Sequence, residues 1–197
     1  MLTETLAALA AFAFVTSITP GPNNLMLMAS GANYGFRRTV PHMLGIGVGF
    51  VVMVIAVGVG LAAVFEAIPA VLTVLQALCV AFLLYLAWKI ATAAPFAADP
   101  ETRGEPMSFL SAALFQWVNP KAWAMALSAI SLYAPDREVM SVISVALIFG
   151  LINLPSVGSW TILGQGMARL LTNPTRARAF NIVMAVLLVG SMGPMLL

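Results

Sequence analysis

The stretch Thr19-Pro20-Gly21-Pro22-Asn23-Asn24 lies within the first long apolar run of the chain, which extends from about Leu6 to Ser30. Each proline removes a backbone hydrogen-bond donor, and the glycine between them lowers the local stiffness, so a helix over this run should open here. The run is long enough for a membrane-spanning helix, which needs about 20 residues. The stretch therefore predicts a spanning helix that is interrupted inside the membrane.

The composition predicts a membrane protein. Of the 197 residues, 61% are hydrophobic and only 8% are charged, and the mean hydropathy is +1.01. A soluble domain carries about 25% charged residues, so most of the outside of this chain must be apolar, and lipid is the solvent that tolerates such a surface. The net charge is only +2, and no basic stripe with interleaved aromatic residues is present, so we expect no nucleic-acid partner.

The residue types also exclude several kinds of site. The chain has one cysteine, Cys79, and one histidine, His42, so it has no redox-active cysteine pair and no multi-histidine metal site. It has no phosphate-binding GxxxxGK[ST] loop, and His42 has no serine partner in its sequence context. We therefore expect no enzyme activity, no metal and no cofactor. His42 begins an apolar run, where it is either a protonatable group or a hydrated side chain at the membrane surface.

Six apolar runs are long enough to cross a membrane, and none has the alternation of an outer-membrane strand. They predict an all-α integral membrane protein with a single transmembrane transporter domain, residues 1–197. The polar segment at about 93–107 divides it into halves of three helices, about 1–92 and about 108–197. The expected helices cover Leu6–Ser30, Val40–Val64, Ala70–Ile90, Phe109–Ile130, Val139–Leu163 and Ala179–Leu197.

Lysine and arginine are concentrated at one end of the expected helices. The loops at the opposite end carry only Arg137, and Lys121 lies inside the fourth helix. Because positive loops stay in the cytoplasm, the segment at 93–107 should be a cytoplasmic linker and both termini should lie on the outer side. With three helices in each half, the second half then enters the membrane in the opposite sense, as in an inverted repeat. The residues at the positive end are Arg37, Arg38, Lys89, Arg103, Arg169, Arg176 and Arg178.

A second break, Asn119-Pro120-Lys121, interrupts the fourth apolar run. Pro120 follows Pro22 after 98 residues (22 to 120), which is about half the chain. Paired breaks at corresponding positions of two repeats indicate the binding site of a transporter. The alternative interpretation is that the prolines only kink two packed helices.

Lys121 would lie about 18 Å along its helix, close to the middle of the membrane. A charge there costs at least about 2.5–3.5 kcal/mol, and it adjoins the positive end of the half-helix that starts after Pro120. A substrate carboxylate would remove this conflict. The alternative is a lysine that extends to the membrane surface.

Asparagines accompany both breaks. Asn23, Asn24 and Asn119 offer donors and acceptors, which suits a zwitterion, and they also suit the capping of half-helices. Asn153, close to Pro155 in the fifth helix, either completes the cavity or lies at a bend. The expected substrate-binding residues are therefore Pro20, Gly21, Pro22, Asn23, Asn24, Asn119, Pro120, Lys121 and Asn153.

These motifs resemble the lysine-exporter (LysE/RhtB) family of bacterial amino-acid exporters, and the resemblance covers essentially the whole chain. It rests on the break at Thr19–Asn24, on Gly35-Phe36-Arg37 and Gly45–Gly49, on Leu86–Ala91, and on Phe115–Lys121. The pattern is most similar to the branch of cysteine/O-acetylserine exporters. Homoserine or threonine stays open as the substrate.

The resemblance implies a secondary active exporter of small neutral amino acids or derivatives in the bacterial inner membrane, driven by the proton gradient. Alternating access would expose the site to each side in turn, with membrane lipid and the amino acid as partners and a homo-oligomer left open. The alternative is an ion channel or metal-ion exporter. Divalent metals need His, Cys or carboxylate ligands, and the expected spans contain few of these.

Overall fold

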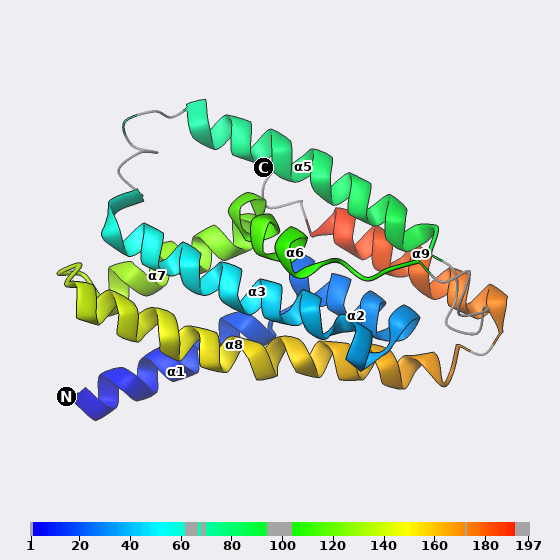
Figure 1. Ribbon diagram of the computed structural model, residues 1–197, viewed down its shortest axis with the longest axis horizontal. Helices are drawn as coiled ribbons and strands as arrows, with labels where there is room; N and C mark the ends of the chain where they lie inside the picture. The colour runs from blue at the N-terminus through cyan, green and yellow to red at the C-terminus, as the bar shows by residue number, and fades with distance from the viewer. Residues whose placement is uncertain (1, 62–66, 68–69, 94–103, 172, 192–197) are drawn as a thin grey trace.

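The computed structural model describes residues 2–61, 67, 70–93, 104–171 and 173–191, and the regular elements within these ranges are all helical (Figure 1). The all-α prediction is therefore confirmed. In chain order the elements are α1 (Leu2–Ile18), α2 (Pro22–Tyr34), α3 (Phe36–Ala56), the π-helical turn η1 (Val57–Leu61), α5 (Ala70–Ala91), α6 (Phe109–Phe115), the 3-10 turn η2 (Gln116–Val118), α7 (Pro120–Tyr133), α8 (Val139–Ala168) and α9 (Pro174–Gly190).

Three or four stretches of the described chain are long and apolar enough to cross a membrane. Three are single helices, at Phe36–Leu61, Thr73–Ala91 and Val139–Ala168, and the pair α1 and α2 forms a fourth that is bent by 58°. The segment from α6 to α7 is divided into shorter helices and α9 has 17 residues, so neither is counted among these stretches. The number of six spans thus stays a prediction. The expected ends at Val64 and Leu197, and residues 94–103 of the linker, lie outside the described residues.

Local sequence determines where several helices begin. Asn173 caps α9 by accepting a hydrogen bond from the Thr175 N–H at 2.8 Å, with Pro174 as the first helical residue. The helix therefore starts before Ala179, where it was expected. Between α2 and α3 the chain turns at Gly35, whose φ of 80° lies in the left-handed region that favours glycine.

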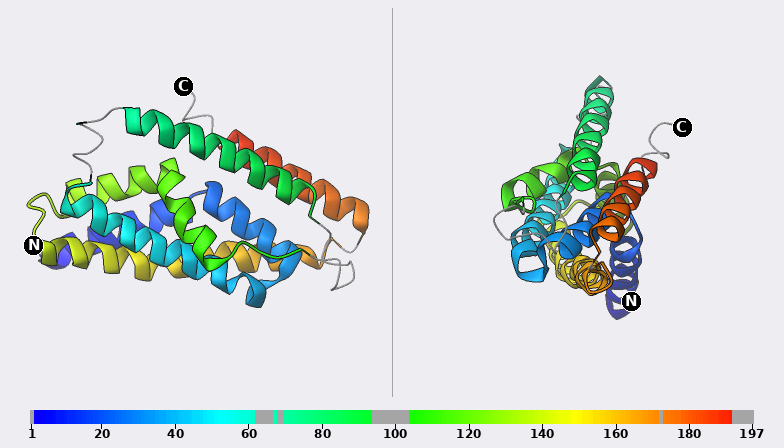
Figure 2. Two further views of the ribbon diagram at one scale, coloured as in Figure 1. Left: turned by 45° about the horizontal axis from the view of Figure 1, so that its top comes forward. Right: turned by 90° about the vertical axis from the view of Figure 1, so that its right-hand side faces the viewer.

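The helices run roughly along the long axis of the molecule (Figures 1 and 2). From the end that holds the N-terminus, α1 runs to the middle of the molecule and α2 continues to the far end. The segment from α6 to α7 runs in the reverse direction, with α6 near the middle of the molecule and α7 leading back to the N-terminal end. The two interrupted segments thus run in opposite directions and approach each other where they are broken.

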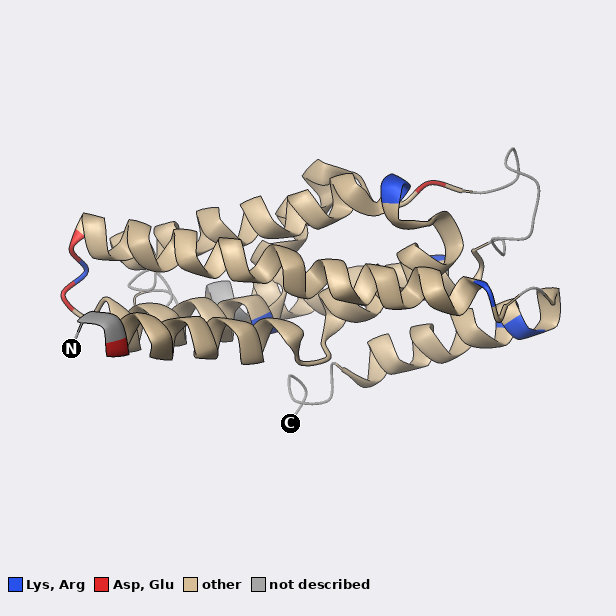
Figure 3. Cartoon of the chain, turned by 90° about the horizontal axis from the view of Figure 1, so that it is seen from below, with Lys and Arg blue, Asp and Glu red and all other residues tan. Residues whose placement is uncertain are grey.

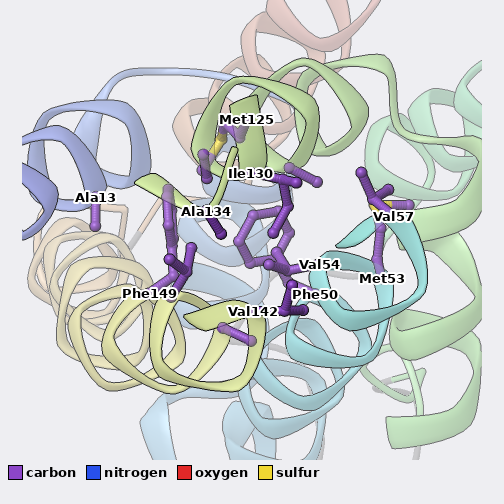
Figure 4. Close-up of a cluster of buried hydrophobic side chains, with 14 of the residues drawn as sticks. Ala13, Phe50, Met53, Val54, Val57, Met125, Ile130, Ala134, Val142 and Phe149 are labelled. Atoms are coloured by element: carbon purple, nitrogen blue, oxygen red, sulfur yellow. The ribbon is translucent and has the colours of Figure 1, made fainter. Parts of the chain in front are cut away.

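Two hydrophobic clusters hold these segments in place. The larger one lies near the N-terminal end and joins α1, α3, α7 and α8, and Phe50 and Phe149 meet inside it with ring centroids 5.0 Å apart (Figure 4). The second joins α2, α5, α6 and α9 through buried residues such as Leu83 and Phe115. The interruptions lie between these two regions of the core.

Charge is distributed unevenly along the long axis (Figure 3). The starts of α3 and α9 and the ends of α5 and α8 meet at the end of the molecule opposite the N-terminus, and they carry Arg37, Arg38, Lys89, Arg169, Arg176 and Arg178. The loop between α7 and α8, at the N-terminal end, contains Asp136, Arg137 and Glu138. We refer to the first of these as the basic end of the molecule.

Candidate functional site

The first interruption is stabilised by a side chain from the helix that follows it. Between α1 and α2 the backbone at Gly21 is extended, with φ −175° and ψ 179°. The Asn24 amide donates hydrogen bonds to the carbonyl oxygens of Ser17 and Thr19, both at 2.8 Å. Carbonyl groups at a helix end lack partners within the helix, so Asn24 supplies partners to the end of α1.

The second interruption is stabilised differently. Asn119 separates η2 from α7, and its side-chain oxygen accepts a hydrogen bond from the Lys121 N–H at 3.1 Å. This capping contact occupies the start of α7. The start of α2, by contrast, has Gly21 as its cap residue and no side-chain cap. Of the two half-helix N-termini, the one at Pro22 is therefore the better prepared to receive an anion.

Lys121 joins the two interruptions. Its ammonium group donates hydrogen bonds to the carbonyl oxygens of Thr19 and Pro20, the latter at 3.4 Å. The side chain crosses Gly21 so closely that a Cβ atom on this glycine would lie 2.7 Å from the Lys121 Cδ. The ammonium therefore has backbone carbonyl oxygens beyond the end of α1 as partners, which the sequence argument did not predict.

A pair of amide side chains makes the second connection between the segments. Asn23 of α2 donates to the Gln116 Oε1 at 2.8 Å, and Gln116 donates back to the Asn23 Oδ1 at 3.3 Å. Gln116 also donates to the Ala112 carbonyl oxygen at 2.9 Å and is fully buried. Sequence reasoning missed Gln116, although a lone amide in the apolar run before Asn119 was a signal that could have found it.

A small cavity of about 20 Å³ lies where the two segments meet, and we call it the central cavity. Its wall includes six of the nine predicted residues, namely Gly21, Asn23, Asn24, Asn119, Lys121 and Asn153. The three prolines do not line it, and they act by ending or starting helices. Other lining groups are Thr16, Ser17, Ile46, Phe50, Gln116, Ala122, Met125 and Val157.

Asn153 reaches the central cavity from α8. This helix is continuous from Val139 to Ala168, so Pro155 does not break it. Asn153 donates to the Ser17 Oγ at 3.1 Å, whereas its buried Oδ1 has no hydrogen-bond partner among the described residues. A buried acceptor without a partner is costly. The residues around the cavity therefore include an unpaired acceptor at one point and an ammonium group at another.

The charges around the central cavity limit what it can bind. Lys121 is half-buried, and every other charged side chain that the structure describes is exposed. The four described acidic residues, Glu4, Glu105, Asp136 and Glu138, are among the exposed ones. Within the described ranges, no group of three or more His, Cys, Asp or Glu side chains is placed to hold a metal ion.

His42 does not lie at a hydrated surface. The side chain is 2% exposed, and neither ring nitrogen has a hydrogen-bond partner in the described part of the chain. It lines a different cavity, closer to the basic end. The interpretation of His42 as a hydrated residue at the membrane surface was therefore wrong.

The comparison with known proteins identifies the family. The sequence model of LysE type translocators matches residues 14–193, which is nearly the whole chain. This protein belongs to the LysE type translocator family. The resemblance seen in the sequence motifs is thus confirmed, and the family is one of transporters rather than enzymes.

Relatives of this LysE family member that carry a functional name are efflux proteins. The cysteine/O-acetylserine efflux proteins of Escherichia coli (strain K12) and Salmonella typhimurium (strain LT2) are each 32% identical to it over 188 residues. The same holds for the protein of that name from Shigella sonnei (strain Ss046). Each comparison covers 93% of both chains. No solved structure matches the chain.

Proposed function

We propose that this protein is a secondary active exporter of small neutral amino acids or their derivatives, of the cysteine and O-acetylserine type, located in the bacterial inner membrane. The observation that carries the proposal is the central cavity, where two oppositely directed, interrupted segments meet around polar groups. The names of the relatives supply the substrate type. Homoserine and threonine belong to the same class of small neutral zwitterions and stay within the proposal.

The wall of the central cavity suits the two charged groups of an amino acid. The Asn153 Oδ1 is buried and has no partner among the described residues, so it can accept a hydrogen bond from a substrate ammonium that reaches it. The substrate carboxylate would lie between the Lys121 ammonium and the uncapped start of α2, replacing the Thr19 and Pro20 carbonyl oxygens as partner of the lysine. Binding would thus release Lys121 from the end of α1.

None of the described acidic side chains is buried, and this favours neutral substrates over dibasic ones. A lysine substrate would bring a second ammonium group, which needs an anionic partner in a dry site. The described carboxylates all lie at the surface, and none lines the central cavity.

We further propose six spans in two inverted repeats, about 1–92 and about 108–197, with the linker at 93–107 in the cytoplasm. The opposite directions of α1–α2 and α6–α7 support this arrangement. The basic end would face the cytoplasm and both termini the outer side. Rocking of one repeat against the other would open the central cavity to each side in turn, and the proton gradient is the proposed energy source.

Counterflow in proteoliposomes tests the proposal. Purified protein would be reconstituted, loaded with one unlabelled amino acid, and offered labelled cysteine, O-acetyl-L-serine, homoserine, threonine or lysine outside. We expect saturable exchange of one or more neutral amino acids and little exchange of lysine. Net efflux should increase with an imposed proton gradient.

The same assay separates the alternative functions. Flux that rises linearly with amino-acid concentration would indicate a channel, and flux of a divalent metal without amino-acid exchange would indicate a metal exporter. Either result from folded protein would overturn the proposed function.

A further inference from the structure

A second cavity, larger than the central one, lies towards the basic end. It has a volume of about 260 Å³ and is lined by α2, α3, α5, α6 and the residues that precede α6. Small-molecule sites in proteins have volumes of about 300–1,000 Å³, so this cavity lies just below that range. We refer to it as the inner cavity. Its polar wall includes Ser30, Asn33, His42 and Ser111, while Lys89 and Glu105 are exposed residues of its lining.

His42 has buried ring nitrogens in this wall whose hydrogen-bonding capacity the described residues leave unused. Both of its ring nitrogens are buried, and neither has a partner among the described residues. Ser30 shares a hydrogen bond with Thr39 at 2.9 Å. Asn33 is paired with Asn181. Burying an imidazole without partners costs free energy, and this cost would be recovered if a polar group of a ligand in the inner cavity reached the ring.

Helices α2 and α3 contribute to the walls of both the inner and the central cavity. On α3, His42 lines the inner cavity and Ile46, about one turn further along, lines the central one. On α2, Asn23 lines the central cavity and Ser30 the inner one. The two cavities therefore follow one another along the same helices, in the direction from the middle of the molecule to the basic end.

The charges of the inner cavity suit the same class of ligand as the central one. Lys89 supplies one cation and Glu105 one anion, and the remaining lining groups are uncharged apart from the titratable ring of His42. A site with one group of each sign favours a zwitterion over a simple anion or cation.

We propose that the inner cavity is a second binding site for the amino-acid substrate, in which His42 forms a hydrogen bond with the bound molecule. This inference rests on the proposed function, because it assigns the same substrate class to a position that precedes the central cavity on the way out of the cell. His42 acts here as a binding residue.

The test uses the fact that the chain has a single histidine. Protein labelled with nitrogen-15 in the histidine ring would give the NMR signals of His42 alone. Addition of O-acetyl-L-serine to the protein in lipid nanodiscs should shift these signals saturably, and sodium acetate at the same concentration should not. The shift should persist in Lys121→Met, because that change alters only the central cavity.

Two outcomes would overturn the inference. One is an unchanged His42 signal at concentrations of O-acetyl-L-serine that saturate exchange in the counterflow assay, a result that leaves the proposed function intact. The other is an equal response to acetate, which would show that the cavity does not select an amino acid. A shift with O-acetyl-L-serine in a protein that fails to exchange it would support the inner site while contradicting the proposed export.

Transport variants give a second, independent readout. Replacing His42 by Phe keeps a ring but removes its hydrogen bonds, and we expect the half-saturating concentration for exchange from the basic end to rise about tenfold. His42→Gln keeps a donor and an acceptor and should restore most of the affinity. Equal half-saturating concentrations in the wild type and both variants would contradict the assigned role.

Discussion

The ammonium group of Lys121 donates a hydrogen bond to the carbonyl oxygen of Thr19, a residue 102 positions earlier in the chain. The contact joins the start of α7 to the backbone just beyond the end of α1. It places a positive charge at the negative end of one half-helix, which is electrostatically favourable. A substrate carboxylate would compete with this carbonyl for the same lysine. The contact between Lys121 and Thr19 would therefore form when the site is empty and break when substrate binds.

Removal of the charge at this position should abolish most transport. Lys121→Met keeps much of the length of the side chain but has no ammonium, and the loss of a charged hydrogen bond corresponds to about a 10- to 100-fold lower exchange rate at low substrate concentration. Arg137→Met removes a positive charge from an exposed loop and serves as the control. Both proteins would be compared by counterflow after equal reconstitution. Normal exchange by Lys121→Met would exclude Lys121 from the site.

Transport should require glycine at position 21, because the Lys121 side chain passes directly over this residue. In Gly21→Ala the new Cβ would lie 2.7 Å from the Lys121 Cδ and 3.2 Å from its Nζ, so the flexible side chain must move. The backbone at Gly21 is extended, so alanine itself is not strained there. We therefore expect a near-normal melting temperature and a clear loss of exchange. Gly166→Ala, where a Cβ would meet nothing within 4 Å, is the control.

The parts of the site that could be predicted from the sequence depend on local chemistry. Two prolines and a glycine interrupt a helix in almost any surroundings, and Asn119 precedes Pro120 as a capping residue does, so both interruptions were predictable. The actual partners of Lys121 and of Gln116 could not be predicted, because both contacts join segments about 100 residues apart. These contacts depend on how the two segments pack.

The effect of Pro155 was left open by local reasoning, and the environment of His42 was predicted wrongly. A proline removes only one backbone hydrogen bond, and α8 stays continuous because its buried residues, such as Phe149 and Val157, are packed on both sides of Pro155. His42 follows a proline near two arginines, which suggests a membrane surface. The structure places Pro41 on the exposed side of α3 and His42 on its buried side. Which side of this apolar helix is buried depends on the helices that pack against it, and these were not known from the sequence.

The open acceptor of Asn153 predicts a specific loss of affinity. Asn153→Leu removes the Oδ1 proposed to receive the substrate ammonium, and the half-saturating concentration should rise about tenfold or more. Ser17→Ala removes only the partner of the Asn153 donor group and leaves the Oδ1 in place, so its effect should be smaller. Both values come from the concentration dependence of counterflow. A larger effect of Ser17→Ala than of Asn153→Leu would contradict the assignment.

The reciprocal amide pair between Asn33 and Asn181 should stabilise the fold near the basic end. Each side chain donates to the other, at 2.8 and 3.1 Å, and Asn181 also donates to the Ala93 carbonyl oxygen at 3.2 Å. Replacing either residue by Ala leaves a buried amide without its partner, at a cost of about 1–3 kcal/mol.

A double-mutant cycle measures this coupling. If the pair acts as one unit, the variant with both changes should be less destabilised than the sum of the two single variants. Thermal unfolding in detergent gives the comparison. Strict additivity of the three melting-point changes would show that the two residues contribute independently.

Two glycines of α8 that lie two positions apart give the sharpest test of the packing between α2 and α8. A Cβ on Gly164 would lie 2.0 Å from the Met28 carbonyl oxygen, whereas a Cβ on Gly166 would meet nothing within 4 Å. Because the obstacle at Gly164 is backbone, the helices must separate, and Gly164→Ala should cost about 1–3 kcal/mol or more. Gly166→Ala should instead be neutral or stabilising by up to about 1 kcal/mol, since alanine favours helix. Melting temperatures of the two variants in the same detergent check the prediction, and equal values would show that α2 and α8 are not in close contact.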